Sequence, residues 1–222
     1  MKNKKYYLFE MDMLSLQIIS TVLLALFALL TYFIYPNISL SNDTLGISFM
    51  LMIPYMILHE IIHSISYVIN GANLKNITYG SHLEKGILCC LCKQNISKKN
   101  ILISLLTPFF FIGIITYIIG ILTSNSILTI LSIFNLSGCS GDLIMFISLS
   151  KLKNFEFSEY DNPIAFGLYS QQDLSKCKLL GLKYIEEVDE LEKKELKKLT
   201  ISKGSIYTFF AYLLLGIFLT RI

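Results

Sequence analysis

Charged residues are scarce in this chain of 222 residues, making up 16% of it against 54% for hydrophobic residues. The apolar residues also occur in long blocks, which is not the composition of a soluble globular domain. The net charge of +3 is small, so the composition gives no support for nucleic-acid binding. Cleavage as a signal peptide is not expected either, because the first apolar block is too long and no small-residue cleavage site follows Tyr35.

Five apolar blocks are candidates for membrane-spanning helices. Four of them reach the roughly 20 residues needed to cross about 30 Å of hydrocarbon, and the fifth is shorter. The sequence therefore predicts an all-α integral membrane protein with about five transmembrane helices and a small cytoplasmic β-hairpin after the second. The five predicted spans are Leu14–Tyr35, Ile47–Ile69, Ile101–Leu122, Ser126–Leu149 and Ser205–Thr220.

The predicted spans divide the chain into three regions. Residues 1–150 are expected to form a four-helix membrane core, residues 151–204 a charged cytoplasmic segment, and residues 205–222 a fifth span. In the charged segment, apolar residues spaced from Leu182 to Leu199 through a Lys- and Glu-rich run favour an amphipathic helix. The short segment before Met13 is expected to lie at the cytoplasmic membrane interface.

Lysine and arginine are absent from the loops 36–46 and 123–125. Lysines instead occur before the first span, in residues 70–100 and in residues 151–204. By the positive-inside rule this alternation predicts a multi-pass protein of the cell membrane with its N-terminus in the cytoplasm. None of the five cysteines falls in a predicted external loop, so no disulfide framework is implied.

Histidine is also rare, but two of the three histidines lie in His59-Glu60-Ile61-Ile62-His63. In a helix, residues four apart share a face, so His59 and His63 can bind one metal ion. Glu60 lies where its carboxylate can reach a metal-bound water and act as a general base. A chance occurrence is expected only about 0.002 times in a chain of this composition, and the pattern is the zinc signature of metalloproteases.

The motif lies inside the predicted span 47–69, where a charged residue costs about 2.5–3.5 kcal/mol. Ionisable residues at that depth favour a functional site. Two alternatives remain open: a polar cluster that packs helices, and a metal site without catalysis. A catalytic zinc ion needs a third protein ligand besides His59 and His63, with the fourth position left for water.

Asp142 is the preferred third ligand, because it is the only charged residue in the fourth predicted span. Counted from the cytoplasmic ends of their spans, His63 lies about 12 Å deep and Asp142 about 13 Å deep. Cys139 is a chemically plausible alternative. Asn135, on the same span, is a weaker candidate for hydrogen bonding to the substrate backbone.

Two further stretches bear on the surroundings of the motif. Residues 76–83 and 87–93 are β-prone runs separated by Glu84-Lys85-Gly86, which predicts a hairpin. It is either a plain connector or a sheet edge able to hold a substrate by strand addition. Its cysteines Cys89, Cys90 and Cys92 are expected to be reduced and half-buried, with a soft-metal site as the alternative. Pro108 is expected to kink the third span.

These motifs together resemble the site-2 protease group of intramembrane zinc metalloproteases. Within that group the chain is most similar to small bacterial membrane proteins described as "putative zincin peptidases", through Leu106-Thr107-Pro108 and the stretch from Asn135 to Gly141-Asp142. The spacing differs from the Asn-Leu-x-Pro and Leu-Asp-Gly pattern of the site-2 group. The resemblance implies Zn²⁺ as cofactor and hydrolysis of peptide bonds in or near the bilayer, with membrane proteins or peptides as substrates.

The expected function is therefore an intramembrane zinc metallopeptidase whose site faces the cytoplasmic half of the bilayer. Two rivals stay open at this point. A non-catalytic membrane protein that uses the metal to join helices would need the ligands but not Glu60. A transporter would need polar groups distributed along the spans, and the first and third predicted spans contain no charge. The sequence does not indicate an oligomeric state.

Overall fold

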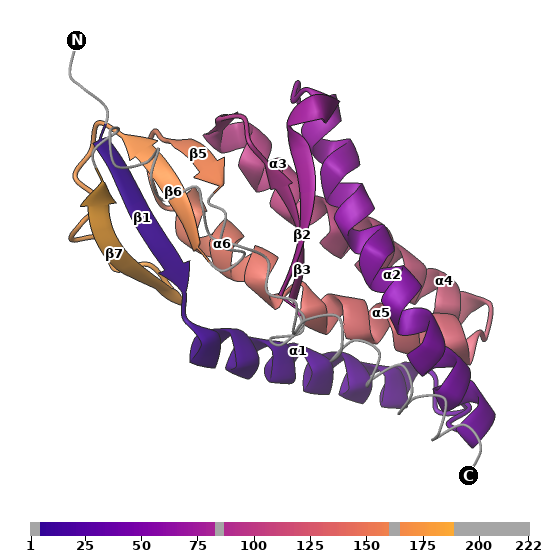
Figure 1. The fold of residues 1–222 in the computed structure, drawn as a ribbon. Coiled ribbons are helices and arrows are strands. Elements are labelled where there is room, and N and C mark those ends of the chain that lie inside the picture. Colours follow the sequence, from indigo (N-terminus) through magenta and orange to yellow (C-terminus); the bar gives the residue numbers. More distant parts are fainter. Residues whose placement is uncertain (1–4, 83–86, 160–164, 189–222) are drawn as a thin grey trace.

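The fold consists of a bundle of apolar helices with an antiparallel β-sheet at one end and a separate hairpin between them (Figure 1). This computed structural model describes residues 5–82, 87–159 and 165–188. The predicted fifth span, at 205–220, lies outside the described residues. The boundaries proposed at residues 150 and 204 stay a prediction.

The first two helices are long and mostly exposed at their surfaces. Helix α1 covers Met13–Ile34 and α2 covers Asn42–Ile69. Asp12 caps the start of α1 by accepting a hydrogen bond from the backbone N–H of Ser15. Helix α2 ends at Asn70, and Gly71 follows with φ of +93°, the left-handed conformation that glycine adopts without strain.

The third apolar segment, Lys98–Leu122, changes its winding partway along. It comprises α3 (Lys98–Pro108), the π-helical segment η3 (Phe109–Ile115) and α4 (Thr116–Leu122). Pro108 removes a backbone donor where the winding changes. The fourth segment is broken into α5 (Ser126–Gly138) and α6 (Ser140–Ser150), which are bent by 42° at Cys139.

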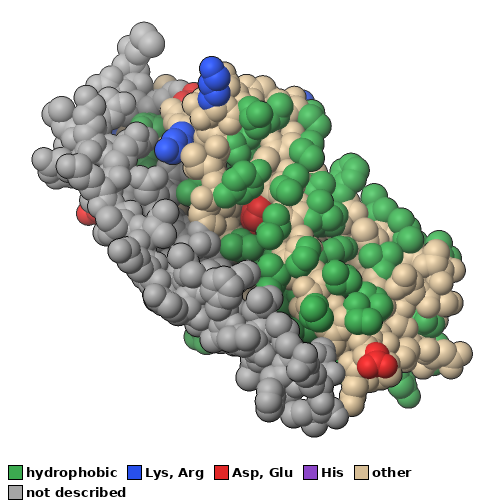
Figure 2. Space-filling model, turned by 45° about the vertical axis from the view of Figure 1, so that its right-hand side comes forward, with side chains coloured by type: hydrophobic (Ala, Val, Ile, Leu, Met, Phe, Trp, Pro, Cys, Tyr) green, Lys and Arg blue, Asp and Glu red, His purple; other side chains and the backbone are tan. Residues whose placement is uncertain are grey.

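Three helical segments are long and apolar enough to cross a membrane: Met13–Ile34, Asn42–Ile69 and Lys98–Leu122. The bent pair α5–α6 would make a fourth if it forms one span. In the face shown in Figure 2, hydrophobic side chains cover most of the helical part, while lysine and arginine side chains lie toward one end. These features are compatible with a membrane protein. They give three to four candidate spans within the described residues, where the sequence predicted four.

The five-stranded sheet contradicts the expected all-α fold. Its strand order is β4-β5-β6-β1-β7, and every pairing is antiparallel. Strand β1 is an inner strand that pairs with β6 through Lys5↔Ser170 to Glu10↔Ala165, and with β7 on its other side. The strands are β1 (Lys5–Met11), β4 (Ile96–Ser97), β5 (Glu156–Glu159), β6 (Ala165–Ser170) and β7 (Leu182–Val188).

Two local expectations were wrong for the same reason. The segment before Met13 is an inner strand of the sheet, with Tyr7 and Phe9 each 1% exposed, rather than a lead-in at the membrane interface. The predicted amphipathic helix from Leu182 to Leu199 is wrong at its start, where Leu182–Val188 form a strand, and the rest of it lies outside the described residues. In both cases the structure is determined by pairing with strands far along the chain and by packing against α6 and α3. These contacts override the preference of the local sequence pattern.

The predicted hairpin is confirmed. Strands β2 (Ile77–His82) and β3 (Ile87–Cys92) pair antiparallel from Ile77↔Cys92 to His82↔Ile87. They form a two-stranded sheet of their own, and β3 packs against α2. Cys90 and Cys92 are buried and Cys89 is half-buried. The cysteines are thus strand residues that contribute to packing, as the sequence suggested.

Candidate metal centre

The two histidines of the motif meet on one face of α2. One helical turn separates them, and His59 Nε2 lies 3.1 Å from His63 Nε2. The motif begins 17 residues into the helix, well away from both ends. The sequence spacing alone therefore brings the two imidazoles together.

Asp142 reaches the same point from another helix. It lies in the first turn of α6, directly after the bend at Cys139. Its Oδ2 atom is 3.2 Å from His59 Nε2, and its Oδ1 atom is 3.4 Å from His63 Nε2. The side chains of His59, His63 and Asp142 are only 12%, 8% and 16% exposed. The equal depth inferred from the sequence agrees with these contacts.

The outer nitrogens of both rings contact oxygen atoms that can only accept a hydrogen bond. His59 Nδ1 lies 3.0 Å from Asn135 Oδ1, and His63 Nδ1 lies 3.0 Å from the carbonyl oxygen of Ser104 on α3. Each Nδ1 must therefore donate. In a neutral imidazole the other nitrogen, Nε2, then carries a lone pair and acts as an acceptor or metal ligand.

Four acceptor atoms consequently converge without a donor among them: two Nε2 atoms and the two carboxylate oxygens of Asp142. Buried acceptors that face one another are costly unless a cation or an added proton lies between them. Tetrahedral zinc with ligand bonds of about 2.0–2.2 Å separates its ligand atoms by about 3.3–3.5 Å. The observed separations of 3.1, 3.2 and 3.4 Å lie within about 0.2 Å of that range, so small side-chain movements suffice for the residues to hold zinc.

Cys139 forms a second possible ligand group with His59 and Asp142, since their ligand atoms lie within 4.8 Å of one another. Its Sγ atom, however, lies 3.9 Å from Nδ1 of His59, the nitrogen that donates to Asn135. The amide nitrogen of Asn135 also lies 3.7 Å from this sulfur. Cys139 is therefore adjacent to the outer side of the His59 ring, while His63 faces the inner side.

Glu60 lines the same cavity as His59, His63 and Asp142. The backbone N–H of Cys90, on the hairpin strand β3, donates a hydrogen bond to its carboxylate. The hairpin is itself fixed to α2 one turn further on, where Ser64 Oγ lies 2.6 Å from Tyr79 OH and 3.1 Å from Cys90 Sγ. Strand β3 thus positions the acidic side chain next to the converging ligand atoms.

A polar cluster ties the helices together one turn before the motif. Tyr55 OH donates to the carbonyl oxygen of Ile112 at 2.7 Å, inside the π-helical segment η3. The same hydroxyl lies 2.7 Å from Thr116 Oγ1, which in turn lies 2.8 Å from Ser132 Oγ on α5. These contacts join α2, η3–α4 and α5, the elements that surround His59 and Asn135.

The cavity in front of Glu60 has a volume of about 570 Å³. Residues of α1, α2, β3, α5 and α6 line it, together with residues of the sheet. Most of its wall is apolar, and Glu60 and Asp142 are its acidic members. Helix α1 forms part of the cavity wall through its first turns.

The structure brings together all five residues that the sequence singled out. The side-chain oxygen of Asn135 contacts Nδ1 of His59, and the residue also lines the cavity, so its substrate-binding role stays a prediction. Sequence analysis did not identify the carbonyl group of Ser104, because a backbone carbonyl carries no residue-specific signal. The Cys90 N–H contact to Glu60 was missed for the same reason.

Comparison with known families gives one match. Residues 52–155 match the family model described as "putative zincin peptidase", which is just under half of the chain and contains the whole metal centre. The match supports a zincin-like zinc metallopeptidase. Comparison with curated proteins and with solved structures gave no match.

Proposed function

We propose that the protein is an intramembrane zinc metallopeptidase, similar to the site-2 protease group, that cleaves membrane-embedded or membrane-adjacent peptides. One observation carries the proposal. The two Nε2 atoms and the Asp142 carboxylate converge at zinc-ligand spacing, and Glu60 lies beside them in a cavity among apolar helices. The zincin match over residues 52–155 supports the peptidase chemistry.

In this proposal His59, His63 and Asp142 hold the metal. Zinc bound there would polarise a peptide carbonyl and lower the pKa of a water molecule. Glu60 accepts the proton of the attacking water on its carboxylate and delivers it to the leaving amine. The Cys90 N–H keeps that carboxylate in place. Asn135 and the Ser104 carbonyl fix the orientation of the two imidazole rings.

The location within a membrane rests on the apolar helices. Segments Met13–Ile34 and Asn42–Ile69 each exceed 20 residues, and His59 and His63 lie well inside the second. The sheet supports the proposed orientation, because it joins strands from three lysine-bearing segments, before α1, after β3 and after α6. Paired strands must lie on one side of the membrane. The lysine distribution makes that side the cytoplasm.

Glu60 favours catalysis over a metal site that only joins helices. A structural site needs the three ligands, and an additional carboxylate held in the adjoining cavity by a backbone N–H would have no purpose there. A transporter would need further polar groups along the helices. The cavity wall of the described residues contains no lysine or arginine.

The test is proteolysis in zinc-loaded proteoliposomes, with single-span apolar peptides labelled at both ends as the probe. The wild type should cleave peptides of this panel, and Glu60→Gln should lower kcat by about 10²–10⁴-fold, the usual contribution of general acid–base catalysis. Glu10→Gln is the matched control, because Glu10 lies on β1 outside the cavity wall. Equal rates for the wild type and Glu60→Gln, or no cleavage by the zinc-loaded wild type, would refute the proposal.

A further inference from the structure

Methionine is concentrated around the candidate site. Of the seven methionines in the chain, five line the cavity in front of Glu60, whereas an even distribution would place about one there. The other two are Met1, outside the described residues, and Met50, which is 51% exposed. The five cavity methionines are Met11, Met13, Met52, Met56 and Met145.

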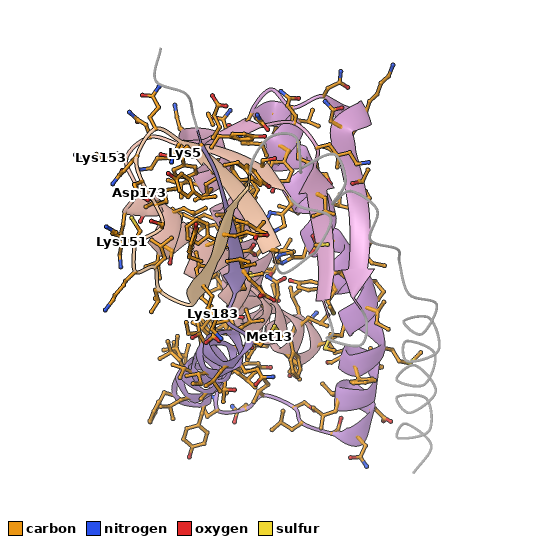
Figure 3. All side chains as sticks on the ribbon, turned by 60° about the vertical axis from the view of Figure 1, so that its left-hand side comes forward. Lys5, Met13, Lys151, Lys153, Asp173 and Lys183 are labelled. Atoms are coloured by element: carbon orange, nitrogen blue, oxygen red, sulfur yellow. The ribbon has the colours of Figure 1, made fainter. Side chains whose placement is uncertain are left out.

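These side chains come from different elements and surround the reacting groups. Met52 and Met56 lie two turns and one turn before Glu60 on α2, at the four-residue spacing that puts all three on one face. Met145 follows Asp142 by three residues on α6. Met13 begins α1 where that helix meets the sheet, close to Lys183 of β7 (Figure 3). The cavity thus has a methionine wall formed by residues of β1, α1, α2 and α6, the last two of which also carry the converging ligands.

The chemistry of methionine determines what such a wall can bind. Its unbranched side chain has three rotatable bonds and a polarizable sulfur, so it fits partners of different shapes and makes favourable contacts with aromatic rings. Surfaces of this kind accept varied apolar partners by repacking. The cavity wall has acidic groups in Glu60 and Asp142 but no lysine or arginine among the described residues. An acidic substrate side chain that lies against this wall, away from the metal, would therefore be buried without a lysine or arginine to pair with it.

We propose that this methionine wall is the specificity pocket of the site. It accepts apolar side chains of different shape next to the bond to be cleaved, including leucine, phenylalanine and isoleucine, and rejects acidic ones. The inference rests on the proposed peptidase function, because it assigns the occupant of the same cavity. The site then distinguishes only apolar from charged side chains in the peptide. The position of the cleaved bond depends on where the peptide enters the cavity.

Binding tests this inference separately from catalysis. The full-length, zinc-loaded Glu60→Gln protein in detergent is titrated with labelled peptides that differ only at one central position, which is leucine, phenylalanine, isoleucine or aspartate. We expect the dissociation constants of the three apolar peptides to agree within about fivefold, and the aspartate peptide to bind at least about tenfold more weakly.

A stiff wall should lose this tolerance. In the Met52→Ile, Met56→Ile double variant the β-branched side chains have one strongly preferred rotamer in a helix. The dissociation constants of the three apolar peptides should then differ by about twentyfold or more, and the phenylalanine peptide should lose the most affinity. Met50→Ile is the matched control on the same helix, because Met50 points away from the cavity and should leave the range unchanged. The zinc content of each variant verifies that the site is folded. A Met52→Leu, Met56→Leu double variant provides a milder replacement, because leucine has a volume similar to that of methionine.

The possible results separate the two proposals. The specificity pocket would be overturned if the dissociation constants of the apolar peptides differed by more than about twentyfold in the Glu60→Gln background. It would also be overturned if the isoleucine variants left the spread of these constants unchanged, or if the apolar peptides did not bind. If the peptides bind as expected but the zinc-loaded wild type cleaves none of them, the pocket stands and the peptidase function fails.

Discussion

The side-chain oxygen of Asn135 lies 3.0 Å from Nδ1 of His59, so that the ring presents Nε2 to Asp142 on its opposite edge. Asn135 was expected from the sequence to bind substrate. Its observed contact fixes the tautomer and the orientation of His59, the usual role of a second residue behind a metal ligand, while the residue also lines the cavity.

Asn135→Ala should weaken zinc binding by about 10–100-fold while leaving all three ligands in place, because His59 loses its hydrogen-bond acceptor. Competition with a calibrated chelator measures the affinity. Ser137→Ala is a suitable control, since the Ser137 hydroxyl is buried on the same helix but donates to the carbonyl oxygen of Phe134. Equal zinc affinity in Asn135→Ala and Ser137→Ala would contradict the positioning role.

Cys139 and His63 are expected to differ in their effect on the metal. Removing the imidazole in His63→Ala takes away one of the three converging ligands, so zinc should be lost. Cys139→Ser should keep zinc, because the sulfur lies next to the Nδ1 edge of His59. Metal content after gel filtration gives the answer for both proteins. Zinc loss in Cys139→Ser with retention in His63→Ala would show that the ligand group is His59, Cys139 and Asp142.

The close approach of α4 to α5 depends on Gly120. A Cβ atom there would lie 2.6 Å from Thr129 Oγ1 and 2.8 Å from the Thr129 backbone nitrogen. Gly120→Ala should therefore destabilise the protein by about 1–3 kcal/mol, the usual cost of overpacking. Gly138→Ala provides the comparison, because no atom lies within 4 Å of its added Cβ. Thermal unfolding in detergent should show a lower midpoint for Gly120→Ala alone, and equal midpoints would contradict the packing.

The junction between the sheet and α1 should depend on pH only in acid. The Lys183 ammonium, 2.6 Å away, and the hydrogen bonds from Ser15 lower the pKa of Asp12 from 3.8 to about 2. Because the folded-state pKa is depressed, the stabilisation is fully present above the unfolded value near 4 and is lost as the pH falls through about 2. Asp12→Asn keeps a capping side chain but removes the charge.

The midpoint of thermal unfolding should therefore differ between the wild type and Asp12→Asn by a constant amount from pH 8 down to pH 5. Between pH 4 and pH 2 the difference should shrink. A difference that grows as the pH falls would contradict the assignment, since it would require a raised pKa for Asp12.

The sequence predicted the helices, the hairpin and the meeting of the motif with Asp142, because each depends on local periodicity or on depth along a span. The five-stranded sheet could not be found in the same way. Its inner strand Lys5–Met11 pairs with residues more than 150 positions away, and no short-range pattern records such a pairing. Strand β7 also carries a lysine- and glutamate-rich sequence typical of exposed helices.

In the candidate site too, some features could be predicted from the sequence and others could not. Side chains that carry the chemistry, namely His59, Glu60, His63 and Asp142, are recognisable by residue type and spacing. Groups that orient them are backbone atoms of Ser104 and Cys90, which any residue would supply. The role of Asn135 depends on which direction its helix faces, and that direction is set by packing of α5 against α1 and α2.

The most direct measurement is the zinc content of the detergent-purified protein, compared with that of His59→Ala, Asp142→Ala and Glu60→Gln. We expect one zinc ion per chain in the wild type and in Glu60→Gln, and none in His59→Ala and Asp142→Ala, because Glu60 is not a ligand. A wild type that binds no zinc, or zinc that remains in His59→Ala and Asp142→Ala, would contradict the metal centre and the peptidase function built on it.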